Sequence, residues 1–310
     1  SVTAMASTGQ ALAAWRDRGA SLTRVQRQSL AMGSVVSFDV VAPSEEDGYA
    51  AVNEAMEIFR ALDATLSMYR PDSEVAALEE AAGDTAVSIS SDTATVLRRA
   101  QALARTTDGR FDVTIEPLMR RWGFRDSPES PVSPPTDTQL RRLQSLVDYR
   151  KLSVKDDRAF LERAGMALDL GGIAGGYALD RAIETMQSMN VAAALINFSG
   201  DLHCFGRPAS GQPWTVHLVD PATLEPREDA IPLRDEALST SGSYQNRRHT
   251  RSGDSWGHLL QPDLGSPVEP TGSVTAIHPS ALEADAWSTA LYLGAEARDP
   301  DLRSIRLSAD

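Results

Sequence analysis

Apolar positions in the first third of the chain repeat with two different periods. Residues 31–42, AMGSVVSFDVVA, alternate apolar and polar side chains and are rich in β-branched residues, which predicts a strand. Residues 45–66 carry apolar side chains at helical spacing after Ser44, a typical N-cap, and therefore predict a helix. A similar pattern predicts a helix over 90–107, and residues 68–83 predict a loop followed by a short helix.

The rest of the chain mixes helical and strand patterns without strict alternation. Residues 125–137 hold four prolines and three serines, which predicts a surface loop or subdomain boundary. Beyond it we expect a helix over 138–147, short strands near Leu152 and Phe160, a strand that turns into a helix through glycines over 167–186, a buried strand with a glycine bulge over 191–206, strands at 214–221, 237–244 and 273–279, a polar loop over 245–254, and a helix over 281–293. This order favours an α+β fold built on a mixed sheet over a doubly wound one.

Length and composition allow a sizeable core. A chain of 310 residues corresponds to one large domain or two ordinary ones, and 42% hydrophobic with 24% charged residues excludes a wholly disordered chain. The Ala- and Arg-rich residues 1–27 predict an N-terminal arm or short helix. No apolar run approaches the roughly 20 residues of a membrane-spanning helix.

The charge balance argues against a nucleic acid partner. With 30 basic and 43 acidic residues, the net charge of −13 does not favour binding to a polyanion. A phosphorylated ligand would have to be held by local backbone dipoles or by a metal ion. Because Cys204 is the only cysteine, an intrachain disulfide and a cysteine zinc site are both excluded.

Two segments carry candidate ligand-binding chemistry. Residues 168–180, LDLGGIAGGYALD, place four glycines at the start of a helix, where backbone groups can approach an anion; a tight packing turn is the alternative. In residues 283–291, EADAWSTAL, Asp285 and Thr289 lie at positions i and i+4 beside Ser288, so their oxygens suit a hard cation. The alternative there is an acid that stabilises the helix dipole.

Two further segments could contact a ligand. Residues 238–244, LSTSGSY, offer hydroxyl groups for phosphate oxygens, and His258 in the following GHLLQP segment could accept a proton or bond a ligand. In residues 109–124, Phe111 and Asp112 could stack on and hydrogen-bond a heteroaromatic ring. The alternatives are a structural histidine and an aromatic core strand with a solvated acid.

Together these segments resemble one family, the ApbE-like FAD:protein FMN transferases. The resemblance runs from Met32 to Gly294 through eight strings in family order: AMGSVVSFDV, LSMYRPDSEVAAL, GRFDVTIEPLMRRWGF, LDLGGIAGGYALD, LINFSGDLHCFG, STSGSY, HLLQP and EADAWSTALYLG. It implies an α+β fold over 28–310 in which two subdomains enclose a flavin cleft. It also implies magnesium-dependent transfer of FMN from FAD to a Thr or Ser hydroxyl of an acceptor protein, with release of AMP.

The resemblance assigns roles to positions in this chain. It implies FAD contacts at Met32, Tyr69, Arg110, Phe111, Asp112, Asp169, Gly175, Thr240 and Leu259. It implies that magnesium is held by the backbone carbonyl of Gly172 with Asp285, Ser288 and Thr289, and that His258 and Asp285 are catalytic. A magnesium ion between the two phosphates would neutralise charge that builds up on the leaving AMP.

Three positions differ from the family pattern. Gly175 stands where a Lys or Glu is usual, Gln261 where an Asp is usual, and Ser199 in a string that usually reads Gly-Gly-Asp. These differences leave two alternatives open: an FAD pyrophosphatase, which makes FMN and AMP with water, and a non-catalytic FAD-binding protein. If the missing cation limits the rate, Gly175→Lys should raise turnover.

The resemblance also implies a partner and a location. The expected acceptor is a redox protein with a Thr- or Ser-containing flavinylation motif, and this chain shows no convincing copy of that motif itself. The expected location is the periplasm or the outer face of the cytoplasmic membrane, and a lipid anchor preceding Ser1 stays open.

Overall fold

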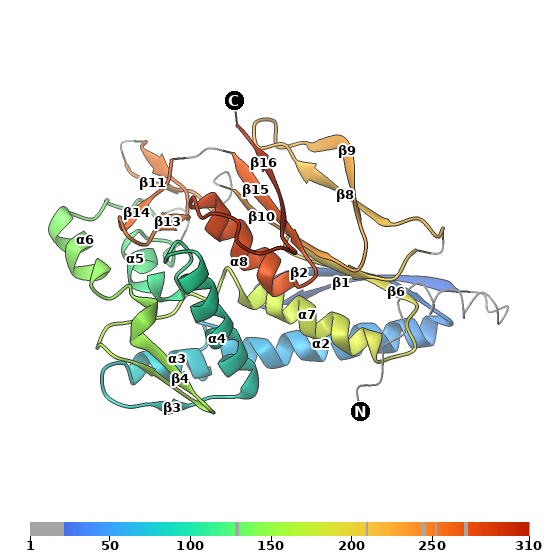
Figure 1. Ribbon diagram of the computed structural model, residues 1–310, viewed down its shortest axis with the longest axis horizontal. Coiled ribbons are helices and arrows are strands. Elements are labelled where there is room, and N and C mark those ends of the chain that lie inside the picture. The colour runs from blue at the N-terminus through green and yellow to red at the C-terminus, as the bar shows by residue number, and fades with distance from the viewer. Residues whose placement is uncertain are drawn as a thin grey trace.

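A large antiparallel sheet forms the centre of the protein. The computed structural model describes residues 22–127, 130–208, 210–242, 246–251, 253–269 and 272–309. Seven strands pair in the order β1-β2-β6-β7-β10-β15-β16 (Figure 1), namely β1 (Thr23–Ala31), β2 (Ser34–Ala42), β6 (Ala193–Phe198), β7 (Asp201–Phe205), β10 (Ala237–Gly242), β15 (Ser273–His278) and β16 (Arg303–Leu307). The predicted α+β fold is confirmed, but the described pairings within this sheet are all antiparallel, where mixed strand directions were expected.

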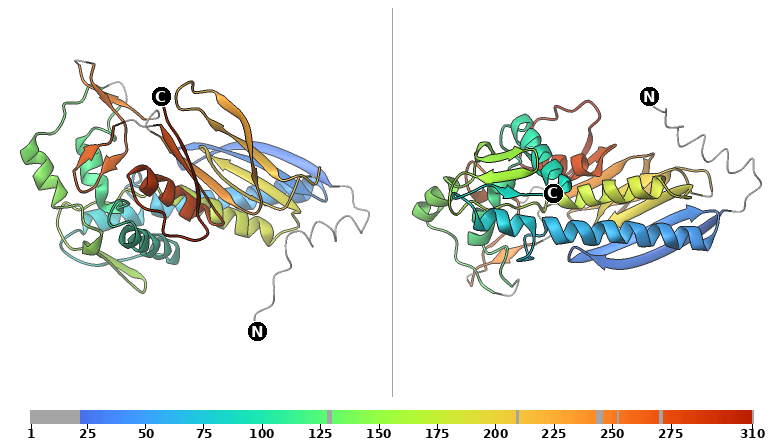
Figure 2. Two further views of the ribbon diagram at one scale, coloured as in Figure 1. Left: turned by 45° about the horizontal axis from the view of Figure 1, so that its top comes forward. Right: turned by 90° about the horizontal axis from the view of Figure 1, so that it is seen from below.

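Each face of the sheet is covered by a different layer. The helices α2 (Glu45–Leu66), α7 (Ala174–Gln187) and α8 (Ala281–Tyr292) pack on one face, and the hairpin of β8 (Trp214–Val219) and β9 (Pro226–Leu233) covers part of the other (Figure 2). Side chains alternate between these layers along a strand: Val40 of β2 joins the core under the helices, and Val41 joins the core under the hairpin.

A smaller unit lies beside one end of the sheet (Figure 1). It contains a three-stranded sheet, short helices and two minor hairpins: α3 (Glu74–Glu80), β3 (Val87–Ser88), α4 (Ser91–Thr106), the 3₁₀ turn Val113–Ile115, α5 (Glu116–Arg121), α6 (Asp137–Gln144), the 3₁₀ turn Tyr149–Lys151, β4 (Leu152–Lys155), β5 (Arg158–Leu161), β11 (Arg248–His249), β12 (Ser255–Trp256), β13 (Leu260–Gln261) and β14 (Ser266–Pro267). No helix among the described residues is both long and apolar enough to cross a membrane.

Helix starts follow the capping residues of the sequence. The predicted helix over 45–66 is confirmed with Ser44 as its N-cap, whose hydroxyl accepts a hydrogen bond from the backbone of Asp47. Helix α4 is capped in the same way by Ser90. The helix predicted over 138–147 is α6, where Thr136 and Gln139 form a capping box.

Three predicted elements differ in the structure. Residues 31–42 are not one strand, because β1 ends at Ala31 and a turn with positive φ at Met32 and Gly33 leads into β2. The expected bulge within 191–206 is a hairpin turn at Ser199 and Gly200, again with positive φ, so the segment forms two strands. The strand expected before the glycine junction is extended chain without strand pairing.

Two of the predicted segments lie partly outside the described residues. Strand β1 begins at Thr23, so residues 23–27 of the expected arm belong to the central sheet, and residues 1–21 lie outside the described residues. Residues 243–245, which include the end of the strand predicted over 237–244, also lie outside them.

The carboxylate of Asp180 joins α7, α8 and β7. It accepts hydrogen bonds from the Ser280 hydroxyl at 2.6 Å and from the backbone of Ala281 and Leu282 at 2.6 and 3.1 Å, which satisfies free donors at the start of α8. Nδ1 of His203 in β7 lies 2.9 Å from the same carboxylate. Burial opposes ionisation of Asp180, but these hydrogen bonds and the charge of His203 hold its pKa below the usual range.

We expect Asp180→Ala to lower the free energy of unfolding by roughly 2 kcal/mol, because buried donors of α8 and His203 lose their acceptor. Glu184→Ala is the matched control, since Glu184 is an exposed acid one turn further along α7. Urea unfolding of both variants measures the difference. Equal stabilities would show that the Asp180 contacts contribute little.

Candidate functional site

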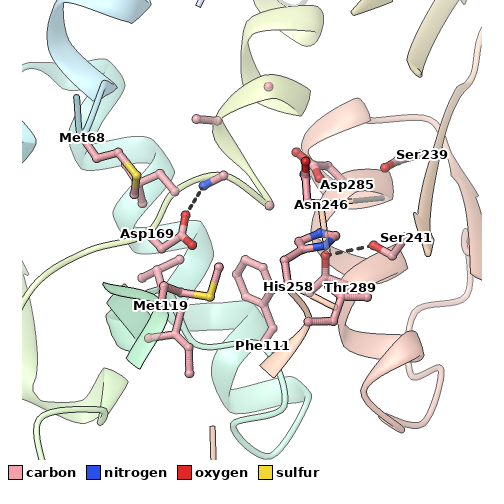
Figure 3. A pocket seen from close by; sticks show the side chains of 18 of the residues that line it. Met68, Phe111, Met119, Asp169, Ser239, Ser241, Asn246, His258, Asp285 and Thr289 are labelled. Atoms are coloured by element: carbon pink, nitrogen blue, oxygen red, sulfur yellow. Dashed lines mark hydrogen bonds between the residues drawn. The ribbon is translucent and has the colours of Figure 1, made fainter. Parts of the chain in front are cut away.

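An open cavity of about 440 Å³ lies between the end of the central sheet and the smaller unit (Figure 3). Its lining brings together segments that are far apart in the sequence. Of the predicted site residues, these line the cavity: Met32, Tyr69, Arg110, Phe111, Asp112, Asp169, Gly172, Gly175, Thr240, His258, Leu259, Asp285 and Thr289. Ser288 is the predicted site residue that does not.

The glycine junction is shaped by Asp169. Its Oδ1 accepts a hydrogen bond from the backbone of Gly171 at 2.8 Å, and its own backbone N–H donates to the carbonyl of Val113 at 2.7 Å. Gly172 follows, and a Cβ placed there would lie 3.3 Å from Oγ1 of Thr289. The absence of a side chain therefore lets the start of α7 approach the cavity face of α8 closely.

Helix α8 presents Asp285 and Thr289 to the cavity, as their spacing predicts. Oδ2 of Asp285 accepts a hydrogen bond from the backbone of Gly176 at 3.2 Å, and Oγ1 of Thr289 lies 3.2 Å from the hydroxyl of Ser241. Ser288 differs: its hydroxyl donates to the carbonyl of Asp285 and lies 2.8 Å from the Ser241 hydroxyl. The structure thus turns Ser288 toward β10, where it supports the site without facing the cavity.

Asp201 is a site residue that the sequence did not single out as a ligand. It lines the cavity at the start of β7, near Asp285. Burial raises the pKa of Asp201 to about 6, although a hydrogen bond from Ser239 opposes this. Burial also raises the pKa of Asp285, and the negative charge of Asp201 raises it further. Two carboxylates therefore share a region of low solvation.

This arrangement fits a hard divalent cation. Carboxylate, hydroxyl and backbone carbonyl oxygens are the ligands that such ions prefer. The high pKa of Asp285 shows that the described protein groups around it do not compensate its charge. Asp285, Thr289 and the carbonyl of Gly172 are the oxygens that could hold the ion, because the turn before α7 and the cavity face of α8 meet here.

Phe111 and Asp112 lie on the opposite wall and differ in what they can offer a ligand. The carboxylate of Asp112 accepts hydrogen bonds from the backbone and hydroxyl of Thr114 at 2.8 and 2.7 Å, and from the backbone of Tyr149 at 2.9 Å. It is buried, which raises its pKa. Asp112 therefore anchors its own loop, and the ring of Phe111 is the group directed into the cavity (Figure 3).

The rim is formed by residues from several loops. Tyr69 is 73% exposed at the mouth, and Arg110 pairs with Asp263 at 3.0 Å. Thr240 lies 2.8 Å from Thr275, hydroxyl to hydroxyl, so it contributes to the wall from within β10. The remaining predicted contacts, Met32 at the β1–β2 turn and the buried Leu259, add apolar surface.

His258 stands beside the oxygen cluster. Its side chain is one of those that line the cavity (Figure 3). The ring of Phe124 contacts it edge-on, with 6.5 Å between centroids, which helps to orient the imidazole. A half-buried imidazole in a cavity wall is a group that could take a proton from a hydroxyl group of a ligand.

Gly175 is covered by an aromatic ring. A Cβ at this position would lie 3.1 Å from the ring of Phe198, which also lines the cavity and packs on Phe59 with 5.4 Å between centroids. No pattern in the sequence connects residues 175 and 198. Phe198 therefore takes up space that the side chain of a longer residue at 175 would need.

A second group of potential metal ligands lies outside this cavity, at His278, Asp299 and Asp301. The backbone of Ser280 donates to Nδ1 of His278 at 2.9 Å, so the proton of the neutral ring lies on Nε2, which is 3.7 Å from Asp299. A histidine that binds a metal must offer an unprotonated nitrogen. In this tautomer the Nε2 proton is directed to the side of Asp299, so the imidazole offers no free nitrogen to a metal ion.

The fold and the cavity define an α+β protein with an oxygen-lined cleft large enough for a nucleotide. The model of the ApbE family matches residues 32–304. Curated relatives include the FAD:protein FMN transferases of Haemophilus influenzae, with 30% identity over 77% of this chain and 71% of the relative, and of Salmonella typhimurium, with 32% identity over 74% and 67%.

Solved structures agree with these matches. The flavinyl transferase ApbE of Pseudomonas stutzeri, in its apo form, superposes with a TM-score of 0.78 at 27% identity and covers 93% of this chain and 96% of that one. The ApbE protein of Thermotoga maritima gives a TM-score of 0.78 at 28% identity, over 87% of both chains. The chain belongs to the ApbE family.

The buried acids predict how the stability of the metal-free protein depends on pH. The folded state keeps a proton on Asp201 up to about pH 6, whereas the unfolded chain releases it near the ordinary value of 3.8. The folded state therefore binds more protons between these values, and stability falls as pH rises through about 6.

We expect Asp201→Asn to remove part of the fall in stability with rising pH, because an amide cannot ionise. In EDTA at pH 7, the free energy of unfolding of the variant should exceed that of the wild type by roughly 1 to 3 kcal/mol. This difference should shrink toward pH 4. Chemical unfolding at a series of pH values measures it. Parallel stability profiles for the two proteins would contradict the shared burial of these carboxylates.

The contact at Gly175 changes the expectation for a lysine there. Gly175→Lys should lower stability by about 1 to 3 kcal/mol, because its Cβ and stem overpack the Phe198 ring. The double variant Gly175→Lys, Phe198→Val has room for the lysine, because the smaller valine opens this space. A gain in turnover over the wild type is therefore expected in the double variant. Thermal unfolding and turnover of both single variants and the double variant test the coupling. If the two substitutions simply add, the ring does not restrict position 175.

Proposed function

We propose that this protein is an FAD:protein FMN transferase that uses magnesium. The observation that carries the proposal is the meeting of Asp285, Thr289 and Gly172 in a cavity that also holds Phe111 and His258. The names of the curated relatives support the same reaction. We infer further that the transferase domain expected over 28–310 begins earlier, with β1 at Thr23, because that strand completes the sheet.

The transfer requires one bond to form and one to break. The oxygen of an acceptor hydroxyl attacks the phosphorus of the FMN half of FAD, and the bond from that phosphorus to the oxygen of AMP breaks. AMP leaves with the electron pair, and a ring nitrogen of His258 takes the hydroxyl proton. The ring of Phe111 offers a face for stacking an aromatic group of FAD. The oxygens of Asp285 and Thr289 would hold a cation that supplies positive charge to the phosphates.

Magnesium, when bound, would neutralise charge on the pyrophosphate. In this chain that contribution matters more than usual, because Asp201, Asp285 and Asp169 all line the cavity and would repel a free dinucleotide. We propose Asp285, Thr289 and the carbonyl of Gly172 as its protein ligands. Ser288 keeps a supporting role through its contact with Ser241.

The proposed partner is a redox protein with a Thr or Ser in a flavinylation motif, and the proposed location is the periplasm or the outer face of the cytoplasmic membrane. Both rest on the family resemblance. An open cavity mouth at Tyr69 supports access by a polypeptide segment.

One incubation separates the candidate activities. The protein is mixed with FAD and magnesium, with and without a redox protein that carries such a motif. Transfer gives a covalent FMN mass increase on the acceptor and stoichiometric AMP. Free FMN without labelled acceptor would indicate a pyrophosphatase, and bound but intact FAD would indicate a binding protein.

Asp285→Ala should reduce magnesium-dependent turnover by at least about 100-fold, because the cavity loses its charged cation ligand on α8. Ser288→Ala is the matched control on the same helix, and it should retain most of the activity because its hydroxyl faces β10. The rate of AMP release, measured for both variants at increasing magnesium concentrations, compares their activities. A Ser288→Ala loss as large as that of Asp285→Ala would contradict the proposed ligand set.

A further inference from the structure

Arg125 is a buried cation in the cavity wall that no sequence pattern indicated. It lies in the turn after α5, and its side chain is 19% exposed. Nε and Nη2 donate to the two oxygens of Glu116 at 2.6 to 3.1 Å, and Nη2 also donates to Oδ2 of Asp169 at 2.8 Å. Because paired charge-assisted bonds fix the plane of a guanidinium, this side chain is held firmly between two acids.

Glu116 is the fixed end of this arrangement. It is 1% exposed, and Arg120 bonds it at 2.8 Å in addition to Arg125. Burial raises the pKa of Glu116, and the hydrogen bond and charge of Arg125 oppose that rise. Without Arg125, Glu116 would keep only its bond from Arg120, and Asp169 would lose its ion-pair partner.

Asp169 is the end that reaches the ligand site. One of its oxygens is held by Arg125, which sets the rotation of the carboxylate, and the other accepts the hydrogen bond from Gly171. The next residue, Gly172, faces Thr289 of the proposed cation site. A continuous series of contacts therefore leads from buried Glu116 through Arg125 and Asp169 to the backbone of the glycine junction.

We propose that Arg125 is a positioning residue for the flavin dinucleotide, acting through Asp169 to hold the glycine junction in its binding conformation. The proposal rests on the proposed function in taking FAD as the ligand. It also explains how a cavity wall with several acids remains compatible with a ligand that carries two phosphates, since Arg125 offsets the charge of Asp169 where the junction is exposed.

The direct test is to measure the affinity for FAD by calorimetry or by flavin fluorescence, in a buffer that contains magnesium. Arg125→Gln should weaken FAD binding roughly 10- to 100-fold, the range found when a residue that orients a ligand-binding group is lost. Arg125→Lys should recover only part of the affinity, because one ammonium cannot reproduce the planar pairing with both acids. Arg121→Gln is the matched control: Arg121 lies on α5, bonds Ser133, Pro134 and Gln139 instead of Glu116, and lies outside the cavity lining, so this variant should bind FAD as the wild type does.

A double-mutant cycle tests the route through Asp169. In an Asp169→Asn background, Arg125→Gln should add little further loss, because the group through which it acts is already altered. Full additivity would overturn the proposal, since Arg125 would then act on FAD directly or through Tyr69, whose ring centroid lies 5.9 Å from its guanidinium carbon.

Thermal unfolding of each variant separates loss of binding from loss of folding, and Arg125→Lys keeps a cation on Glu116 should the Gln variant unfold. If the wild type itself does not bind FAD, the proposed function fails and this proposal with it. If the wild type binds FAD and Arg125→Gln binds it equally well, the proposed function stands and the role of Arg125 is wrong.

Discussion

The close packing of α7 against α8 is the constraint on which the site depends. A Cβ at Gly176 would lie 2.3 Å from the carbonyl oxygen of Ala281, so a larger residue at that position would push the helices apart. The same helix pair is fastened one turn later by the Asp180 carboxylate at the start of α8. Because the helices meet this closely, the glycine junction at the start of α7 reaches the acid and hydroxyl of α8.

Packing the helices in this way concentrates negative charge. Asp285 lies on α8 and Asp201 on β7, and burial raises the pKa of both. Such carboxylates reduce the stability of the empty protein at neutral pH. A bound cation would reverse this effect, so the charge that destabilises the empty cavity is also a source of affinity for a metal-bound dinucleotide.

The sequence was most informative where function depends on local spacing. Capping by Ser44 placed the start of one helix, and the i, i+4 pair of Asp285 and Thr289 placed two cavity oxygens on one helix face. The family resemblance also assigned Ser288 to the magnesium site, but its hydroxyl is bonded to the carbonyl of Asp285 and lies 2.8 Å from the Ser241 hydroxyl of β10.

What the sequence could not provide were contacts between distant segments. Arg125 begins a proline-rich stretch that reads as an ordinary surface loop, and its partners lie 9 and 44 positions away. Phe198 and Gly175 become neighbours only when β6 meets α7. No local period encodes such pairs, because they arise from tertiary packing.

Arg125 and the proposed cation have complementary places in the cavity. Arg125 is held by protein acids and offsets charge at Asp169, on the side of the glycine junction that faces α5. It is not among the groups that shift the pKa of Asp285. In the site as proposed, Arg125 would keep the junction in shape before any ligand arrives, and a cation held by Asp285 and Thr289 would complete the other half of the site together with the dinucleotide.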